Sequence, residues 1–160
     1  MKYRALEADH ELILLRTELE GFIEGMGFFL VELNLFRRSA RRTPAQVQVS
    51  AVIAAQSHLP MGTDELAKVH RAILPRLELF FEGADISVEL SSPGLDRRIK
   101  EGAEFRFFQG QGVSCYLTAL SRWESGVLSA SGSEGIELES GGAARFIPFN
   151  EIGKAKLREV

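Results

Sequence analysis

The chain has 160 residues, of which 45% are hydrophobic and 26% charged, and its formal net charge is −3. These proportions are ordinary for a folded globular protein and exclude disordered, collagen-like and disulfide-rich classes. The acidic balance excludes a uniformly basic nucleic-acid coat but leaves room for local basic patches. The single cysteine cannot form an internal disulfide, and no apolar run approaches the roughly 18 residues that span a bilayer. Glu7, Asp9 and Glu11 lie where a signal peptide would be apolar, so we expect a cytoplasmic protein without a membrane partner.

The chain begins with a helical pattern, which two strand patterns follow. Apolar residues spaced three and four apart predict a helix over residues 12–26, ended by Gly25 and Gly27. Alternation then predicts strands over 29–36 and 46–53, joined as an antiparallel hairpin by an arginine-rich loop. The expected apolar faces of these strands consist of Phe29, Val31, Leu33 and Leu35 in the first and Val47, Val49, Ala51 and Ile53 in the second.

A second helical pattern covers residues 66–80. Thr63 is its expected N-cap, because a hydroxyl accepts hydrogen bonds from the unpaired N–H groups of the first turn. Pro75 is expected to kink or break this helix, since an internal proline costs about 3 kcal/mol. A third strand is predicted over 86–91. The order α-β-β-α-β predicts an α/β sandwich with both helices on one face of a small sheet.

From residue 101 onward, short alternating runs are separated by glycine and serine. A helical turn over 103–110 is followed by five predicted strands, with Trp123 in the turn between the first two. Short strands in this arrangement predict a small closed barrel, which has no exposed edges. We therefore expect an α+β protein with an N-terminal domain of residues 1–92 and a C-terminal domain of residues 93–160.

The sequence contains no recognisable catalytic or metal-binding pattern. His10, His58 and His70 lack the spacing of metal ligands, and Cys115 alternates with apolar residues, which is typical of a buried structural thiol. We therefore expect no catalytic residue, no metal and no cofactor.

Basic residues gather at three places in this acidic chain. Guanidinium and ammonium groups bind phosphate oxygens, so each cluster is a candidate contact with an anionic partner such as RNA. A solvated charged loop is the alternative for the first cluster. The last cluster has period-2 spacing, which places its members on one face of a strand. The clusters are Arg37, Arg38, Arg41 and Arg42 in the hairpin loop, Arg97, Arg98 and Lys100 near the domain joint, and Lys154, Lys156 and Arg158 near the C-terminus.

The most distinctive motif is Ser91-Ser92-Pro93-Gly94-Leu95-Asp96-Arg97. A strand that ends before a Pro-Gly turn predicts a stiff joint between two domains. Gly94 is expected to take a conformation that only glycine enters cheaply.

The joint motif resembles the signature that connects the two domains of the ribosome maturation factor RimP family. Other segments are similar in order and spacing, namely 27–33, 62–66, Phe105 to Gly110, and 147–157. The chain departs from the family pattern at Arg98, where members commonly have proline. It also departs at 53–56, where members often carry an aspartate.

This resemblance implies an α/β domain followed by an SH3-like (Sm-like) barrel. It also implies a non-enzymatic factor that acts in maturation of the small (30S) ribosomal subunit. The implied partners are the 30S precursor, the twelfth small-subunit ribosomal protein, which is strongly basic, and small-subunit ribosomal RNA. We expect the factor to be a monomer.

Two alternatives remain at this point. The first is a general RNA-binding module that has no preference for immature subunits. The second is an enzyme that uses Asp96 and Glu101 near the joint, because paired carboxylates can perform acid–base chemistry.

Overall fold

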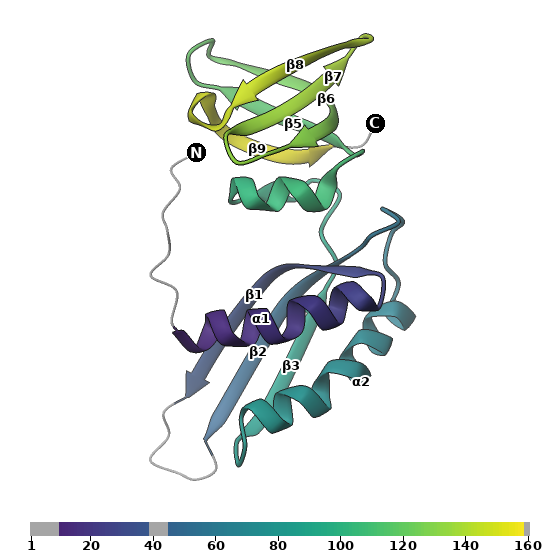
Figure 1. The fold of residues 1–160 in the computed structure, drawn as a ribbon, viewed down its shortest axis with the longest axis vertical. Coiled ribbons are helices and arrows are strands. Elements are labelled where there is room, and N and C mark those ends of the chain that lie inside the picture. The colour runs from purple at the N-terminus through teal and green to yellow at the C-terminus, as the bar shows by residue number, and fades with distance from the viewer. Residues whose placement is uncertain (1–9, 39–44, 159–160) are drawn as a thin grey trace. The chain divides into compact units, whose positions relative to one another are not determined.

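The computed structural model describes residues 10–38 and 45–158 (Figure 1). The chain divides into two compact units, with the boundary between Pro93 and Gly94. Each unit is built around its own sheet, three-stranded in the first and six-stranded in the second. The fold is α+β. In the described part of the chain, no helix is long and apolar enough to cross a membrane.

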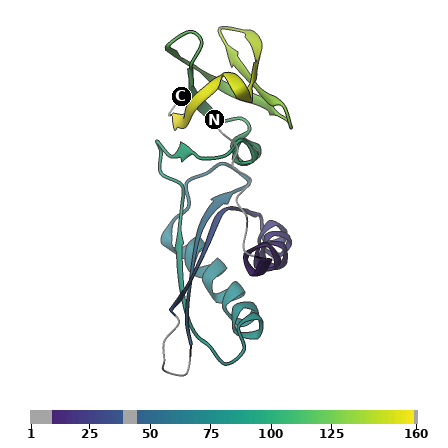
Figure 2. The same ribbon diagram turned by 90° about the vertical axis from the view of Figure 1, so that its left-hand side faces the viewer.

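The first unit follows the predicted order α-β-β-α-β. Its strands lie in the order β1-β2-β3, with β1 antiparallel to β2 and β2 parallel to β3. A parallel pair requires a crossover, which α2 supplies. Both helices pack on the same face of the sheet (Figures 1 and 2). The elements are α1 (His10–Gly25), β1 (Phe28–Arg38), β2 (Gln46–Ala55), α2 (Thr63–Phe80) and β3 (Asp85–Ser91).

A single apolar core joins these helices to the sheet. The alternation predicted for β2 is confirmed, because its four predicted apolar residues are all buried in this core. The predicted helical stripes are confirmed as well. Their fully buried members are Leu15 and Leu19 on α1 and Val69, Ile73 and Leu77 on α2, and Ile23 of α1, which the predicted stripe did not include, is fully buried as well.

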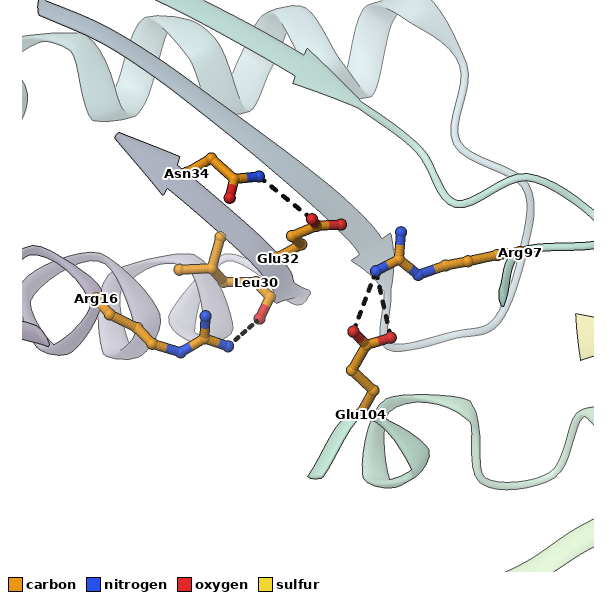
Figure 3. Close-up of polar contacts among 6 residues, drawn as sticks. All are labelled: Arg16, Leu30, Glu32, Asn34, Arg97 and Glu104. Carbon is orange, nitrogen blue, oxygen red and sulfur yellow. Dashed lines mark hydrogen bonds and ion pairs between the residues drawn. The ribbon is translucent and has the colours of Figure 1, made fainter. Parts of the chain in front are cut away.

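The predicted apolar face of β1 is wrong at its start. The pairing with β2 shifts between Leu30 and Glu32, which leaves Val31 as the extra residue of a β-bulge. Leu30 and Leu33 therefore both belong to the core, whereas Val31 is buried outside it. Arg16 of α1 donates a hydrogen bond of 3.3 Å from Nη2 to the Leu30 carbonyl beside the bulge (Figure 3).

Helix α2 differs from its prediction at two residues. Its N-cap is Gly62 rather than Thr63, and the Glu65 carboxylate accepts a hydrogen bond of 2.9 Å from the Gly62 backbone N–H. The helix also runs through Pro75 without a break. Val69 and Ile73 before the proline and Leu77 after it are buried in one core, and this packing holds the two halves in a single helix.

The second unit contains a sheet in the order β4-β9-β5-β6-β7-β8, in which all neighbouring strands are antiparallel. Its core includes the fully buried phenylalanines of η1, of which Phe105 stacks on Phe149 with ring centroids 5.9 Å apart. The elements are β4 (Arg98–Ile99), η1 (Gly102–Phe108), β5 (Gly112–Leu117), β6 (Arg122–Ser131), β7 (Gly135–Ser140), β8 (Ala143–Pro148), η2 (Phe149–Glu151) and β9 (Ile152–Arg158).

The predicted closed barrel is not confirmed. Among the described residues, β4 and β8 form the two ends of the strand order and do not pair with each other. The position predicted for Trp123 is wrong, because this residue belongs to β6, and the turn before it contains Ser121 with φ of 50°. Strand β4 was not predicted, because two residues are too few to show an alternation.

Candidate nucleic-acid interface

The basic cluster of β9 lies on one exposed face of the second sheet. Lys154, Lys156 and Arg158 are exposed, and they alternate with the buried residues Ala155 and Leu157. This arrangement agrees with the period-2 spacing seen in the sequence.

The strand register extends this face across the sheet. Lys156 lies opposite Arg98 of β4 and opposite Ser114 of β5, which in turn lies opposite Ser125 of β6. Directly opposed residues of antiparallel strands share a face. The sheet thus brings Arg98 from the second basic cluster next to the third cluster.

The neighbouring row of opposed residues on this face contains two aromatic rings. Lys154 lies opposite Tyr116, and Tyr116 lies opposite Trp123. The two rings pack edge to face with centroids 5.5 Å apart. We call the whole surface the basic–aromatic face, and it consists of Arg98, Ser114, Tyr116, Trp123, Ser125, Lys154, Lys156 and Arg158.

Cations on this face lie close to the aromatic rings. The Nζ atom of Lys156 is 5.3 Å from the Trp123 ring centroid, and that of Lys154 is 6.0 Å from the Tyr116 centroid. Both distances are in the range of cation–π contacts. Rings that accept stacked bases, placed next to cations that bind phosphate, are the combination used by proteins that bind single-stranded nucleic acid.

Arg97 has a different environment from Arg98. Its side chain is 10% exposed, and Nη2 contacts both carboxylate oxygens of Glu104, at 3.2 and 3.3 Å (Figure 3). Its backbone is also fixed, because the Arg97 N–H donates to the Gly94 carbonyl and the Leu157 N–H donates to the Arg97 carbonyl. The geometry gives Arg97 a structural role in anchoring the start of the second unit. Glu104 was not among the residues predicted from the sequence. The only feature that distinguishes it there is that it is a single acidic residue in the largely apolar segment of η1.

One prediction for the joint motif, the conformation of Gly94, differs from the structure. Gly94 does not adopt a left-handed conformation, and a Cβ atom at this position would meet only an Asp96 carboxylate oxygen at 3.6 Å. The predicted requirement for glycine is therefore wrong. Ser91 ends β3, and Ser92, Leu95 and Asp96 are exposed.

The hairpin arginines are only partly within the described residues. Arg37 forms an ion pair with Glu11, and its guanidinium lies 5.5 Å from the Phe81 ring centroid. Arg38 is the last residue of β1. Arg41 and Arg42 lie outside the described residues. In the second cluster, Lys100 is exposed directly after β4.

The first sheet presents an acidic face on the side away from its helices. Ile86, Val88 and Leu90 of β3 pack against the core, so the alternating residues Asp85 and Glu89 lie on the opposite side. Glu32 of β1 accepts a hydrogen bond of 3.2 Å from Asn34 (Figure 3). Glu32 and the 59% exposed Phe36 alternate with the core-facing Leu33 and Leu35, so they lie on this side as well. We call this surface the acidic face, and it consists of Glu32, Phe36, Asp85 and Glu89.

The remaining candidate for chemistry is the buried thiol. Burial raises the pKa of Cys115 from 9.0 to about 12, and the negative charge of Glu124 adds to this effect. A thiol with this pKa is protonated at neutral pH and is a poor nucleophile. Among the described residues, no group of three or more His, Cys, Asp or Glu side chains is arranged to hold a metal ion.

No family model matches this chain. The ribosome maturation factor RimP of Borrelia garinii subsp. bavariensis is 27% identical over 139 residues, which are 87% of this chain and 90% of the relative. The RimP proteins of Borrelia hermsii and Borrelia recurrentis are also 27% identical, over 87% and 82% of this chain and 90% and 85% of the relatives.

The chain is thus similar, over most of its length, to curated proteins named ribosome maturation factor RimP. The resemblance seen in the sequence motifs is thereby confirmed. An alignment of 139 residues is longer than either unit, so the likeness to RimP proteins extends over both. Arg98 lies in β4, where it adds a cation to the basic–aromatic face.

Proposed function

We propose that this chain is a non-enzymatic assembly factor for the small ribosomal subunit. The observation that carries this proposal is the similarity to curated ribosome maturation factors, which covers nine-tenths of their length. The proposed site of action is the cytoplasm, and the proposed form is a monomer of two domains, residues 1–92 and 93–160. We regard the sheet of the second unit as a variant of the SH3-like barrel that the family resemblance implies.

The two charged faces suggest how such a factor holds its partners. The acidic face suits the basic twelfth small-subunit ribosomal protein, because opposite charges speed encounter and disfavour wrong partners. The basic–aromatic face suits small-subunit ribosomal RNA, because lysine and arginine neutralise phosphates and release bound counterions. A factor of this kind promotes maturation by binding one arrangement of protein and RNA more tightly than the other.

The proposal is tested by sedimentation of the purified protein with 30S precursors and with mature 30S subunits. We expect the protein to travel with the precursors in preference to the mature particles. The triple variant Lys154→Gln, Lys156→Gln and Arg158→Gln should bind precursors about 10-fold more weakly or worse, because three phosphate contacts are lost. The control variant Lys68→Gln removes an exposed charge from α2 of the other unit and should bind normally.

The general RNA-binding module remains the second candidate function. The basic–aromatic face alone supports this reading, since such a face binds many single strands. Equal binding to precursors, mature subunits and isolated RNA would favour the general module and contradict the assembly role.

A further inference from the structure

The basic–aromatic face contains a groove of about 510 Å³ that lies wholly within the second unit. This volume is in the range of small-ligand sites in proteins. The groove is lined by Leu95, Asp96, Ser114, Trp123, Ser125, Lys156, Leu157 and Arg158.

Two large apolar side chains border the groove. Trp123 is 47% exposed, and Leu95 is 69% exposed. The ring of Tyr116 packs edge to face against Trp123 at an interplanar angle of 64° and supports it from the neighbouring strand. A flat, supported and half-exposed indole offers a stacking surface, which is worth about 1–3 kcal/mol per base and thus about 5-fold or more in affinity.

Two serine hydroxyls add polar groups to the same groove. The Oγ atoms of Ser114 and Ser125 are 2.7 Å apart, and Ser114 is 4% exposed. Each hydroxyl has one donor hydrogen and two acceptor lone pairs, and the bond between them uses only one donor and one lone pair. A donor and further acceptors remain to bind the edge of a ligand.

The charges around the groove favour an anionic ligand. Lys156 and Arg158 line it directly, and Asp96 is the single carboxylate in its lining. Arg98 and Lys154 lie on the same face. Because Lys156 Nζ lies 5.3 Å from the Trp123 ring centroid, a stacking surface and a phosphate-binding cation are within the span of one nucleotide. A basic protein segment would be repelled here, so the groove and the acidic face select different partners.

We propose that this groove binds one nucleotide of a single-stranded RNA segment. The base stacks on Trp123, its edge forms hydrogen bonds with the hydroxyls of Ser114 and Ser125, and the flanking phosphates contact Lys156 and Arg158. The inference rests on the proposed function in one respect, because ribosomal RNA supplies the strand.

Trp123 is the only tryptophan of the chain, so its fluorescence reports on this groove alone. The full-length protein is titrated with an eight-nucleotide oligouridylate and, in parallel, with an abasic ribose-phosphate oligomer of equal length. We expect saturable quenching with the oligouridylate and none with the abasic oligomer. Binding of both should weaken as salt is raised, because both carry phosphates.

Variants then separate stacking from charge, with binding followed by the anisotropy of a labelled oligouridylate. Trp123→Phe keeps a flat ring and should bind within about 2-fold of the wild type, whereas Trp123→Leu should bind about 5-fold more weakly or worse. The double variant Ser114→Ala and Ser125→Ala should bind the oligouridylate more weakly, and its affinity for the abasic oligomer should be unchanged. Lys68→Gln serves as the charge control, and circular dichroism checks the folding of every variant.

Three results would overturn the inference. They are unchanged fluorescence at saturating oligouridylate, equal binding by Trp123→Phe and Trp123→Leu, and quenching by a basic peptide but not by RNA. If any of these occurs while the protein still sediments with 30S precursors, the groove assignment fails and the assembly role stands. If the oligouridylate quenches Trp123 but precursors are not preferred, the nucleotide site stands and the assembly role fails.

Discussion

At the residue scale, Arg97 and Glu104 form a buried ion pair in the second unit. Both side chains are about nine-tenths buried, and the pair lies directly after the joint motif. The loss of one partner from a buried pair leaves the other charge uncompensated. The ion pair therefore holds Arg97 largely away from solvent.

Glu104→Ala should lower the free energy of unfolding of the second unit by about 3 kcal/mol, because the largely buried guanidinium of Arg97 would lose the carboxylate that lies 3.2 Å from its Nη2 atom. Chemical denaturation followed by circular dichroism measures this loss. Glu101→Ala removes an equal charge from the exposed residue three positions earlier and should change the stability by less than about 0.5 kcal/mol. Equal effects of the two substitutions would show that Glu104 has no special role.

The thiol of Cys115 provides a prediction about pH. Its pKa is about 12 in the folded protein and near 9.0 when solvated, so only the unfolded chain loses this proton between these values. The stability that burial of the neutral thiol provides is thus complete below pH 9 and is lost as the pH rises towards 12. The difference in unfolding free energy between wild type and Cys115→Ala should shrink across this window. A difference that is constant with pH would contradict the assigned pKa.

At the element scale, α2 is stabilised by its buried face despite an unfavourable residue. Pro75 is exposed and lacks the N–H that would donate to the Arg71 carbonyl. The buried stripe of Val69, Ile73 and Leu77 holds the helix together around this defect. Packing rather than local propensity therefore determines the length of α2.

Pro75→Ala should raise the free energy of unfolding of the first unit by about 1–3 kcal/mol, since one backbone hydrogen bond is regained and a steric clash is removed. Thermal and denaturant unfolding measure the change. Leu79→Ala, at a residue that is 82% exposed on the same helix, is the matched control and should be nearly neutral. A lower free energy of unfolding for Pro75→Ala would contradict this prediction, because it would mean that Pro75 stabilises the helix.

Strand β1 shows how one residue alters the faces of an element. The bulge at Val31 shifts the alternation, so residues that a strict period of two assigns to one face lie on both. Arg16 then donates to the Leu30 carbonyl beside the bulge, which links α1 to β1 (Figure 3).

At the scale of the whole molecule, each unit has its own sheet and its own buried residues. The core of the first unit is formed by α1, α2 and the β1-β2-β3 sheet, all of which precede Pro93. The second unit buries Phe105, Phe107 and Phe108 together with residues of its own strands. We therefore expect each unit to fold without the other.

The fragment of residues 94–160 should show a cooperative thermal transition and dispersed amide signals in NMR spectra. Because the basic–aromatic face belongs to this unit alone, the fragment should also bind the oligouridylate with an affinity within about 3-fold of the full chain. The fragment of residues 1–93 is the control and should fold without binding this RNA. A random-coil spectrum for the fragment of residues 94–160 would contradict independent folding.

The amino-acid sequence alone determined the features that depend on local periodicity. The burial of alternate residues in β2 and β9, the helical stripes and the joint motif were all readable, because side-chain direction repeats along each element. The resemblance to RimP proteins was recognisable from the same segments.

Only the tertiary structure decided which elements meet and in what register. In the tertiary structure, Arg98 lies opposite Lys156, and Arg97 forms an ion pair with Glu104. Trp123 belongs to β6 rather than to a turn. Among the described residues, the two end strands of the second sheet do not pair with each other. These outcomes depend on contacts between residues that are distant in the sequence. Periodicity describes which face a residue occupies, but it contains no information about the residue that lies opposite.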